Sequence, residues 1–489
     1  MSLTTVHRQR QQLRKEISDG IKESFIPPSS ILIHWDSKLI KYLTGKVDDR
    51  VAILISGKPD LENPKLLGIP VIANSTGEAQ HNAVIDLLRE WKVFDKVVGL
   101  VFDTTASNTG RLKGSATSIE KTLGRAVLWF ACRHHVYEIH VKHVSDSVMG
   151  KRNSPSEALF VRFQKDWKDF DQEQSNLVLF DWEVNDDLIN VGHQVLEWAT
   201  GCLASKTFPR EDYRELVQLT VLFLGGTVPD FRFRKPGAHH HARFMAYSIY
   251  FLKMQLLSYQ FEMSHEESKA VKEMSIFIAL FHSEAFLKSR LSTISPAVDL
   301  KYLSLMQLYK QENLAAATVA IKSVHNHLWY LTEEAVVLSI FDSELDSALR
   351  QRLVEKLLTI PRPKSYAPGK PKFPKINSAG TIIDYPNQLT TFLGPRSWLL
   401  FSLLNLGDEC FDWMYTPVDS WKNMAGYKKI EKIVRSFEVV NDCAERAIKL
   451  ISDFKDTVVK VTDQEYLFQV IEDHRTHFTS FNKSSLKNL

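Results

Sequence analysis

The first third of the chain carries strand-like runs of apolar residues. Residues 30–40 alternate between apolar and polar positions, and residues 50–56 and 65–73 form two further runs rich in Val, Ile and Leu. Residues 97–102 are apolar apart from one glycine, and residues 126–131 form a second continuous run. Alternation is typical of a half-buried strand, and a short continuous run is typical of a strand buried on both faces. The pattern therefore predicts five strands.

Helical patterns separate the last three of these strands. Residues 75–91 begin with a capping signal, Thr76 followed by Glu78, and residues 115–123 form a shorter helix. The predicted order is β-β-β-α-β-α-β. Short turns favour antiparallel pairing of the first three strands, and the helix after the third returns the chain for parallel pairing by a right-handed crossover. The sequence therefore predicts a mixed α/β sheet.

The middle of the chain changes to helical periodicity with almost no strand signal. Between residues 156 and 323, apolar residues recur at helical spacing, as in 187–199, 213–224, 242–259 and 266–286. This stretch predicts a large all-helical part.

Composition limits the classes of function. At 489 residues the chain is too long for one ordinary hydrophobic core, so several structural units are expected. The net charge is only +3, so a nucleic-acid site must be a local patch. The sequence has no GxxxxGK[ST], GxGxxG, GxSxG or HExxH motif and no repeat of fixed period. These absences remove support for nucleotide-driven, dinucleotide-dependent and common hydrolytic activities.

Cysteines and apolar runs bear on the compartment. The cysteines Cys132, Cys202, Cys410 and Cys443 are scattered without a CxxC pair, which argues against a disulfide framework and favours a reducing nuclear or cytoplasmic setting. No apolar run approaches about 18 residues, so no membrane span is expected. Residues 1–20 are basic and polar, unlike a secretory signal. They are either a solvated helix or an arm that touches DNA or a partner.

One aspartate lies within a predicted strand and another directly follows one. Asp36 lies within the first strand, and Asp103 comes directly after the fourth, followed by a polar loop that contains Asn108. A carboxylate at the end of a central strand is well placed to hold a divalent cation over the sheet edge. The alternatives are an exposed residue on an alternating strand for Asp36 and a turn cap for Asp103.

A Cys132-Arg133-His134-His135 sequence follows the fifth strand. With the preceding element order, this CxxH sequence resembles the hAT-type DNA transposases, which have a ribonuclease H-like fold. The resemblance implies that a helical insertion splits the core after this point and that a catalytic Glu follows the insertion. The aspartate loop DTTASNTG departs from the commoner wording, and no BED zinc finger precedes it. A diverged or domesticated relative is therefore as compatible with the sequence as a mobile transposase.

The resemblance divides the chain into five expected parts. They are a basic N-terminal arm (1–29), the first part of a ribonuclease H-like core (30–150), an all-helical insertion (151–325), a part that completes the core (326–405) with a Pro- and Lys-rich loop (361–375), and a helical C-terminal region (406–489) that is a candidate oligomer surface.

The third carboxylate is expected in residues 327–345. Thr332 is a candidate N-cap, and Glu333 and Glu334 open the helix after it. Glu333 shares a face with apolar residues three, four and seven positions later, whereas Glu334 shares the neighbouring face. Sequence does not separate the two, and Glu344 is the third choice. Both could equally be favourable first-turn carboxylates.

The resemblance implies two Mg²⁺ or Mn²⁺ ions. Asp36 would bridge them, Asp103 would hold one, and Glu333 or Glu334 the other. Asn108, Cys132 and His135 would support this site. A zinc site made by Cys132 with neighbouring histidines and a Cys–His nucleophile are the alternatives for the CxxH residues.

A basic and aromatic stretch, 231–244, is the candidate DNA contact. Arginines there would grip phosphates, and phenylalanines would stack on an unpaired base. In the alternative interpretation, the aromatic rings pack in the core and the charges face water. The candidate DNA-binding residues are Arg232, Arg234, Lys235, His240, Arg243 and, from a later helix start, Arg396.

These features predict a transposase- or integrase-like nuclease that cleaves and joins DNA phosphodiester bonds with an Asp-Asp-Glu set. A domesticated, inactive module that binds nucleic acid or protein is one alternative. An α-rich scaffold around an unrelated α/β core is another.

Overall fold

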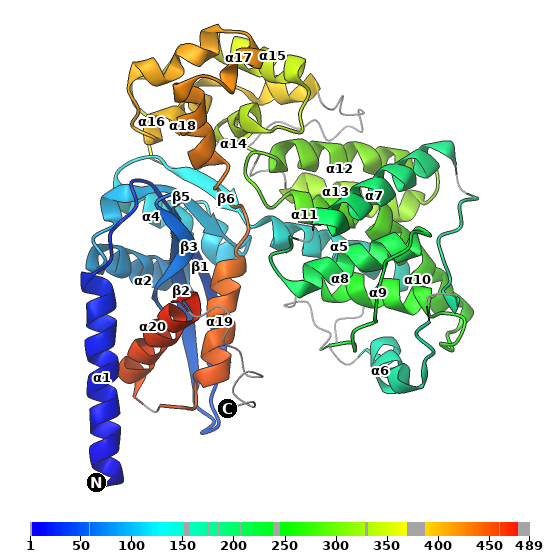
Figure 1. Ribbon diagram of the computed structural model, residues 1–489, viewed down its shortest axis with the longest axis horizontal. Coiled ribbons are helices and arrows are strands. Elements are labelled where there is room, and N and C mark those ends of the chain that lie inside the picture. The colour runs from blue at the N-terminus through cyan, green and yellow to red at the C-terminus, as the bar shows by residue number, and fades with distance from the viewer. Residues whose placement is uncertain are drawn as a thin grey trace.

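The computed structural model gives the protein a mixed α/β sheet with helices on both faces, a separate helical bundle and an upper helical lobe (Figure 1). The structure describes residues 2–57, 59–150, 157–173, 176–183, 185–205, 207–237, 245–327, 331–368, 387–458 and 460–477. None of the helices in these ranges is long and apolar enough to cross a membrane.

The sheet has the order β3-β2-β1-β5-β6, with β4 paired to β2. Its strands are β1 (Ile31–Lys41), β2 (Val47–Gly57), β3 (Leu61–Gly68), β4 (Val71–Ile72), β5 (Val97–Phe102) and β6 (Leu128–Ala131). The pairs β1–β2 and β2–β3 are antiparallel, whereas β1–β5 and β5–β6 are parallel. The predicted succession of strands along the chain and the predicted mixture of antiparallel and parallel pairing are confirmed. The predicted third strand is divided into β3 and β4, with Pro70 between them.

Two apolar layers cover the sheet because strand residues alternate between its faces. On one face, Ile53 belongs to a core that includes α2 (Gly77–Glu90) and α4 (Ser115–Leu123). On the other face, Leu54 packs with α19 (Asp442–Phe454) and α20 (Val461–His477). The short elements η1 (Phe94–Lys96) and α3 (Ala106–Thr109) connect this region.

The basic N-terminal segment is helix α1 (Leu3–Glu23), which projects from the sheet and lies along α20 (Figure 1). Arg14 Nε donates to Asp463 Oδ1 at 2.7 Å, so part of this helix is held by an ion pair. The predicted helix is therefore present, and one of its faces has a partner within the chain.

The helical bundle lies beside the sheet and begins directly after β6 (Figure 1). Its elements are α5 (Arg133–Met149), α6 (Ala158–Asp166), η2 (Trp167–Asp169), α7 (Asp186–Ser205), α8 (Glu211–Phe223), α9 (Ala246–Leu256), α10 (His265–Phe277), the π-helical η4 (Ile278–His282), α11 (Ser283–Lys288), α12 (Ser295–Tyr309) and α13 (Leu314–His327). The predicted all-helical character of this part is confirmed over the described residues.

A smaller lobe follows the bundle. Its elements are α14 (Glu333–Val336), η6 (Val337–Phe341), α15 (Ser347–Leu358), η7 (Asn387–Phe392), η8 (Pro395–Trp398), α16 (Leu399–Leu403), η9 (Asp408–Tyr415), α17 (Val418–Trp421) and α18 (Ala425–Val434). Residues 326–405 were expected to complete the core, but this part meets the sheet through α14 at the edge strand β6. Helix α19 instead lies against β1 and β2. The C-terminal region therefore returns to the sheet.

Candidate active site

Asp36 and Asp103 lie next to each other in the middle of the sheet, where β5 ends beside β1. His34 of β1 pairs with Val101 of β5 in parallel register, and each aspartate lies two residues beyond its member of that pair. Burial and the charge of Asp103 raise the pKa of Asp36 to about 7. Burial is the larger cause and the neighbouring carboxylate adds to it, so the charged form of Asp36 is disfavoured.

Asn108 holds Asp103 in place. Its Nδ2 donates to Asp103 Oδ1 at 2.7 Å, and its Oδ1 accepts from Trp35 Nε1 at 2.8 Å and Ser115 Oγ at 2.6 Å. Thr105 N and Oγ1 also donate to Asp103 Oδ1, at 2.8 and 2.6 Å. Because Trp35 precedes Asp36, this buried amide connects the backbones that carry the two aspartates.

The CxxH residues lie beside the aspartates at the start of α5. His135 is near enough to Asp103 for that carboxylate to oppose the fall in its pKa that burial causes. Cys132 is fully buried, and its Sγ accepts the Asn441 N–H at 3.2 Å. Burial raises the pKa of the Cys132 thiol, which disfavours the thiolate that a nucleophile or zinc ligand needs.

The other histidines of α5 point to different neighbours. His134 Nδ1 lies 3.0 Å from Asp442 Oδ1, His140 stacks on Tyr302, and His143 shares a hydrogen bond with a serine of α13. These contacts do not gather the histidines around Cys132.

Sequence reasoning missed a further carboxylate near this pair, Glu445. It lies in the first turn of α19, and its pKa is raised well above the usual value by burial, Asp442 and Asp36. Arg210, which precedes α8 in the bundle, reaches Glu445 Oε2 with Nη1 at 3.9 Å. The available signal was Asn441-Asp442, a helix-start pair that follows two valines and precedes a strongly amphipathic helix.

Glu333 and Glu334, which were predicted for the aspartate site, are both engaged by the start of η8. Arg396 Nη2 donates to the buried Glu334 at 3.0 Å, and the Arg396 backbone N–H donates to Glu333 Oε2 at 2.7 Å. Ser397 Oγ donates to the Glu333 carbonyl at 3.0 Å. Both glutamates therefore join α14 to η8. Arg396, expected to contact DNA, is engaged in the same cluster.

The carboxylates converge without forming a finished metal centre. Over the described ranges, no three or more His, Cys, Asp or Glu side chains are grouped so that they could hold one metal ion. Glu445 is therefore a neighbour of the aspartate pair, and the described side chains form no ready-made site for a single ion.

The basic stretch divides into buried rings and exposed charges. Phe233 is buried against Trp167, which corrects the expectation that this ring stacks on a base. Arg232, Arg234 and Lys235 are exposed. Arg234 pairs with Glu211, which follows Arg210 at the start of α8. The exposed charges therefore adjoin the segment that reaches Glu445. His240 and Arg243 lie outside the described residues.

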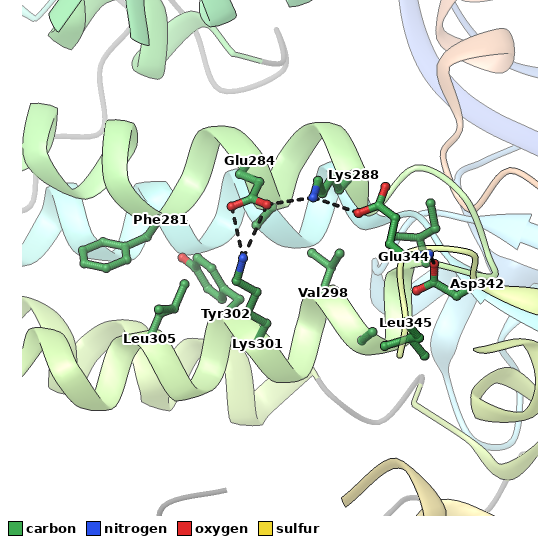
Figure 2. A pocket seen from close by; sticks show the side chains of 13 residues that line it. Phe281, Glu284, Lys288, Val298, Lys301, Tyr302, Leu305, Asp342, Glu344 and Leu345 are labelled. Atoms are coloured by element: carbon green, nitrogen blue, oxygen red, sulfur yellow. Dashed lines mark hydrogen bonds and ion pairs between the residues drawn. The ribbon is translucent and has the colours of Figure 1, made fainter. Parts of the chain in front are cut away.

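A separate cavity of about 220 Å³ lies in the bundle (Figure 2). Four of its charged groups pair with one another. Lys288 lies 2.9 Å from Glu284 and 2.8 Å from Glu344, and Lys301 lies 3.4 Å from Glu284. Glu344, the third choice for the missing carboxylate, is therefore part of this cavity.

Comparison of the chain with protein-family models, curated proteins and solved structures finds no match.

Proposed function

We propose that this protein is a metal-dependent nuclease of the transposase or integrase kind, which cleaves and joins DNA phosphodiester bonds. The observation that carries the proposal is the pair Asp36–Asp103 on adjacent parallel strands, with Glu445 approaching Asp36 from a helix that arrives after the bundle. Glu445 replaces Glu333 and Glu334 as the third carboxylate of the proposed set.

A ribonuclease H-like, hAT-type architecture is the fold interpretation that agrees best with this arrangement. Three strands joined in antiparallel fashion are followed by two parallel strands, in the order β3-β2-β1-β5-β6. The bundle and lobe are inserted between β6 and α19, so the chain leaves the sheet after two carboxylates and returns with the third.

The donor set suits hard divalent cations. Burial and Asp103 raise the pKa of Asp36, and burial, Asp442 and Asp36 raise the pKa of Glu445, so a bound cation would favour the charged form of both. Carboxylate oxygens are the ligands that Mg²⁺ and Mn²⁺ prefer. Asp36, Asp103 and Glu445 would hold two ions, which would activate the attacking hydroxyl and stabilise the leaving oxygen. Since the described donors to Asp103 all reach Oδ1, its Oδ2 is the oxygen available for a cation.

The chain's own residues orient the substrate and the carboxylates. Arg232, Arg234 and Lys235 offer positive charge to a phosphate backbone near the start of α8. Asn108 fixes the rotamer of Asp103, and His135 lies where it can hydrogen-bond a phosphate oxygen close to that carboxylate. In the reaction a water or a DNA 3′-hydroxyl attacks phosphorus and gives up its proton to solvent, the P–O3′ bond breaks, and the released 3′-oxygen takes up a proton from solvent.

The test is nicking of supercoiled plasmid DNA by the purified protein in Mg²⁺ or Mn²⁺. We expect Asp103→Asn and Glu445→Gln to lower the nicking rate by more than about 100-fold, because outer-shell partners of metal ligands alone are worth about 10–100-fold. Glu334→Gln is the matched control, since it neutralises another largely buried glutamate that faces an arginine. Equal losses in Glu334→Gln and Glu445→Gln would remove Glu445 from the proposed set.

A second candidate is a DNA-binding module of the same ancestry without catalysis. It is favoured by the lack of a three-ligand metal group over the described residues. Plasmid binding that persists in wild type and Asp103→Asn, without nicking in either metal, would select this candidate.

A further inference from the structure

The first turn of α19 is fixed to the sheet on one side. Asn441 Nδ2 donates to the Trp35 carbonyl at 2.7 Å, and the Asn441 N–H donates to Cys132 Sγ at 3.2 Å. Trp35 immediately precedes Asp36 in β1. The start of α19 is therefore tied to the backbone of one aspartate and to the end of β6.

The helical bundle forms hydrogen bonds with the first turn of α19 from the other side. Tyr213 of α8 donates its hydroxyl to Asp442 Oδ2 at 2.6 Å, and His134 lies 3.0 Å from Asp442 Oδ1. Asp442, Tyr213 and His134 are all buried. Arg210, three residues before Tyr213, lies 3.9 Å from Glu445.

The charge on Asp442 is stabilised in this setting. Burial alone would raise the pKa of this carboxyl, but His134, Tyr213 and Arg210 outweigh burial and hold the pKa below its usual value. A charged, buried Asp442 keeps its hydrogen bonds strong, since charge-assisted bonds are roughly twice as strong as neutral ones. The contact between α8 and α19 is therefore made through directional hydrogen bonds to a charged side chain.

We infer that Tyr213 and Arg210 are positioning residues, which act through Asp442 and Glu445 to set the height and rotation of α19 above Asp36. Glu445 follows Asp442 by three residues, so the two side chains share one face of the helix. A small shift of the anchored turn moves the Glu445 carboxylate relative to the aspartates. The bundle thereby becomes part of the carboxylate site. This inference rests on the proposed function, because Glu445 matters here as a metal ligand.

Tyr213→Phe is the informative variant, with Tyr302→Phe as its matched control. Both tyrosines are buried in the bundle next to histidine rings of α5. The Tyr302 hydroxyl, at the cavity drawn in Figure 2, has no hydrogen-bond partner among the described residues, whereas the Tyr213 hydroxyl binds Asp442. The two substitutions remove the same atom from similar surroundings and differ in what that atom holds.

Mn²⁺ binding to the full chain can be measured from the loss of the electron paramagnetic resonance signal of free Mn²⁺. This measurement distinguishes a role in positioning Glu445 from a role in the overall stability of the fold. We expect Tyr213→Phe to weaken Mn²⁺ binding by about 10–100-fold, the range for residues that orient metal ligands, and plasmid nicking to recover at saturating Mn²⁺. Tyr302→Phe should bind Mn²⁺ like wild type. Asp103→Asn serves as the reference for a lost ligand.

The outcomes distinguish the two proposals. If Asp103→Asn loses Mn²⁺ binding while Tyr213→Phe and Tyr302→Phe both match wild type, the positioning inference is overturned and the proposed metal site stands. If Asp103→Asn binds Mn²⁺ like wild type, the proposed function fails, and the positioning inference falls with it.

Discussion

At the scale of single residues, the negative charge of Asp36 is unfavourable for the stability of the fold. In the unfolded chain it loses its proton near its ordinary pKa of 3.8, whereas in the fold burial and Asp103 raise that pKa to about 7. Between these pH values the folded state binds a proton that the unfolded state has released. The free energy of unfolding therefore falls as the pH rises from about 4 to 7 and stays low above that range.

Asp36→Asn should consequently stabilise the metal-free protein at pH 8 and leave its stability at pH 4 nearly unchanged. The gain is at most roughly 1.4 kcal/mol for each pKa unit of the shift, because asparagine has no charge to desolvate. Urea unfolding in EDTA at both pH values measures it. Asp86→Asn, at an exposed position of α2, is the control and should change neither midpoint. A loss of stability in Asp36→Asn at pH 8 would contradict the prediction.

At the scale of elements, the strands could be predicted because their patterns are local. Residues 97–102 are apolar apart from one glycine, and β5 is indeed buried along its whole length. Asp103 stood out because it ends such a strand. Asp36 lies where β1 changes from buried to exposed positions, so alternation alone did not reveal that it faces Asp103. Parallel register between β1 and β5 brings the two together.

The third carboxylate could not be located because many amphipathic helices follow β6 and their order along the chain says little about which one returns. Glu333 and Glu445 both lie in a first turn with apolar residues behind them. The difference is tertiary. Helix α14 has four residues before it tightens into η6, whereas α19 is long enough to cover β1 and β2. Its alanines and isoleucines match the apolar face of β2.

The α14–η8 cluster gives a prediction at the same scale. Burial raises the pKa of Glu334, and Arg396 opposes that rise. Arg396→Ala leaves this carboxylate buried without its ion pair, which should lower the free energy of unfolding by about 3 kcal/mol at pH 8. The loss should be smaller at pH 5, because a protonated Glu334 needs no cation. Urea unfolding at both pH values measures the difference.

The double variant Glu334→Gln/Arg396→Ala is the control for this interpretation. It removes the buried charge together with its partner, so its stability should no longer differ from wild type in a pH-dependent way over this range. A pH-dependent loss of the same size in the double variant would assign the effect to another group.

At the scale of the whole molecule, the two ends of the inserted bundle and lobe are hydrogen-bonded to each other. The chain leaves the sheet at Cys132 and returns at Asn441, and the Arg133 N–H donates to the Val439 carbonyl at 2.9 Å between these points. The bundle is also joined to this junction by a buried ion pair, since Arg133 Nε lies 3.1 Å from Asp299 Oδ2 of α12. We therefore expect the sheet and the bundle to unfold together.

Asp299→Asn tests that coupling. It removes the negative charge that lies against the buried Arg133 guanidinium, so the free energy of unfolding should fall by about 3–5 kcal/mol. Hydrogen exchange should speed up together in α12 and in β5 and β6, although the substituted residue lies in the bundle. The control is Asp181→Asn. The partner of Asp181, Lys272, lies 3.6 Å away, and about half of each side chain is exposed. Loss of this pair should lower the free energy of unfolding by no more than about 1 kcal/mol. Faster exchange confined to α12 would mean that the bundle opens while the sheet stays folded, and a carboxylate site shared between them would then lose its structural basis.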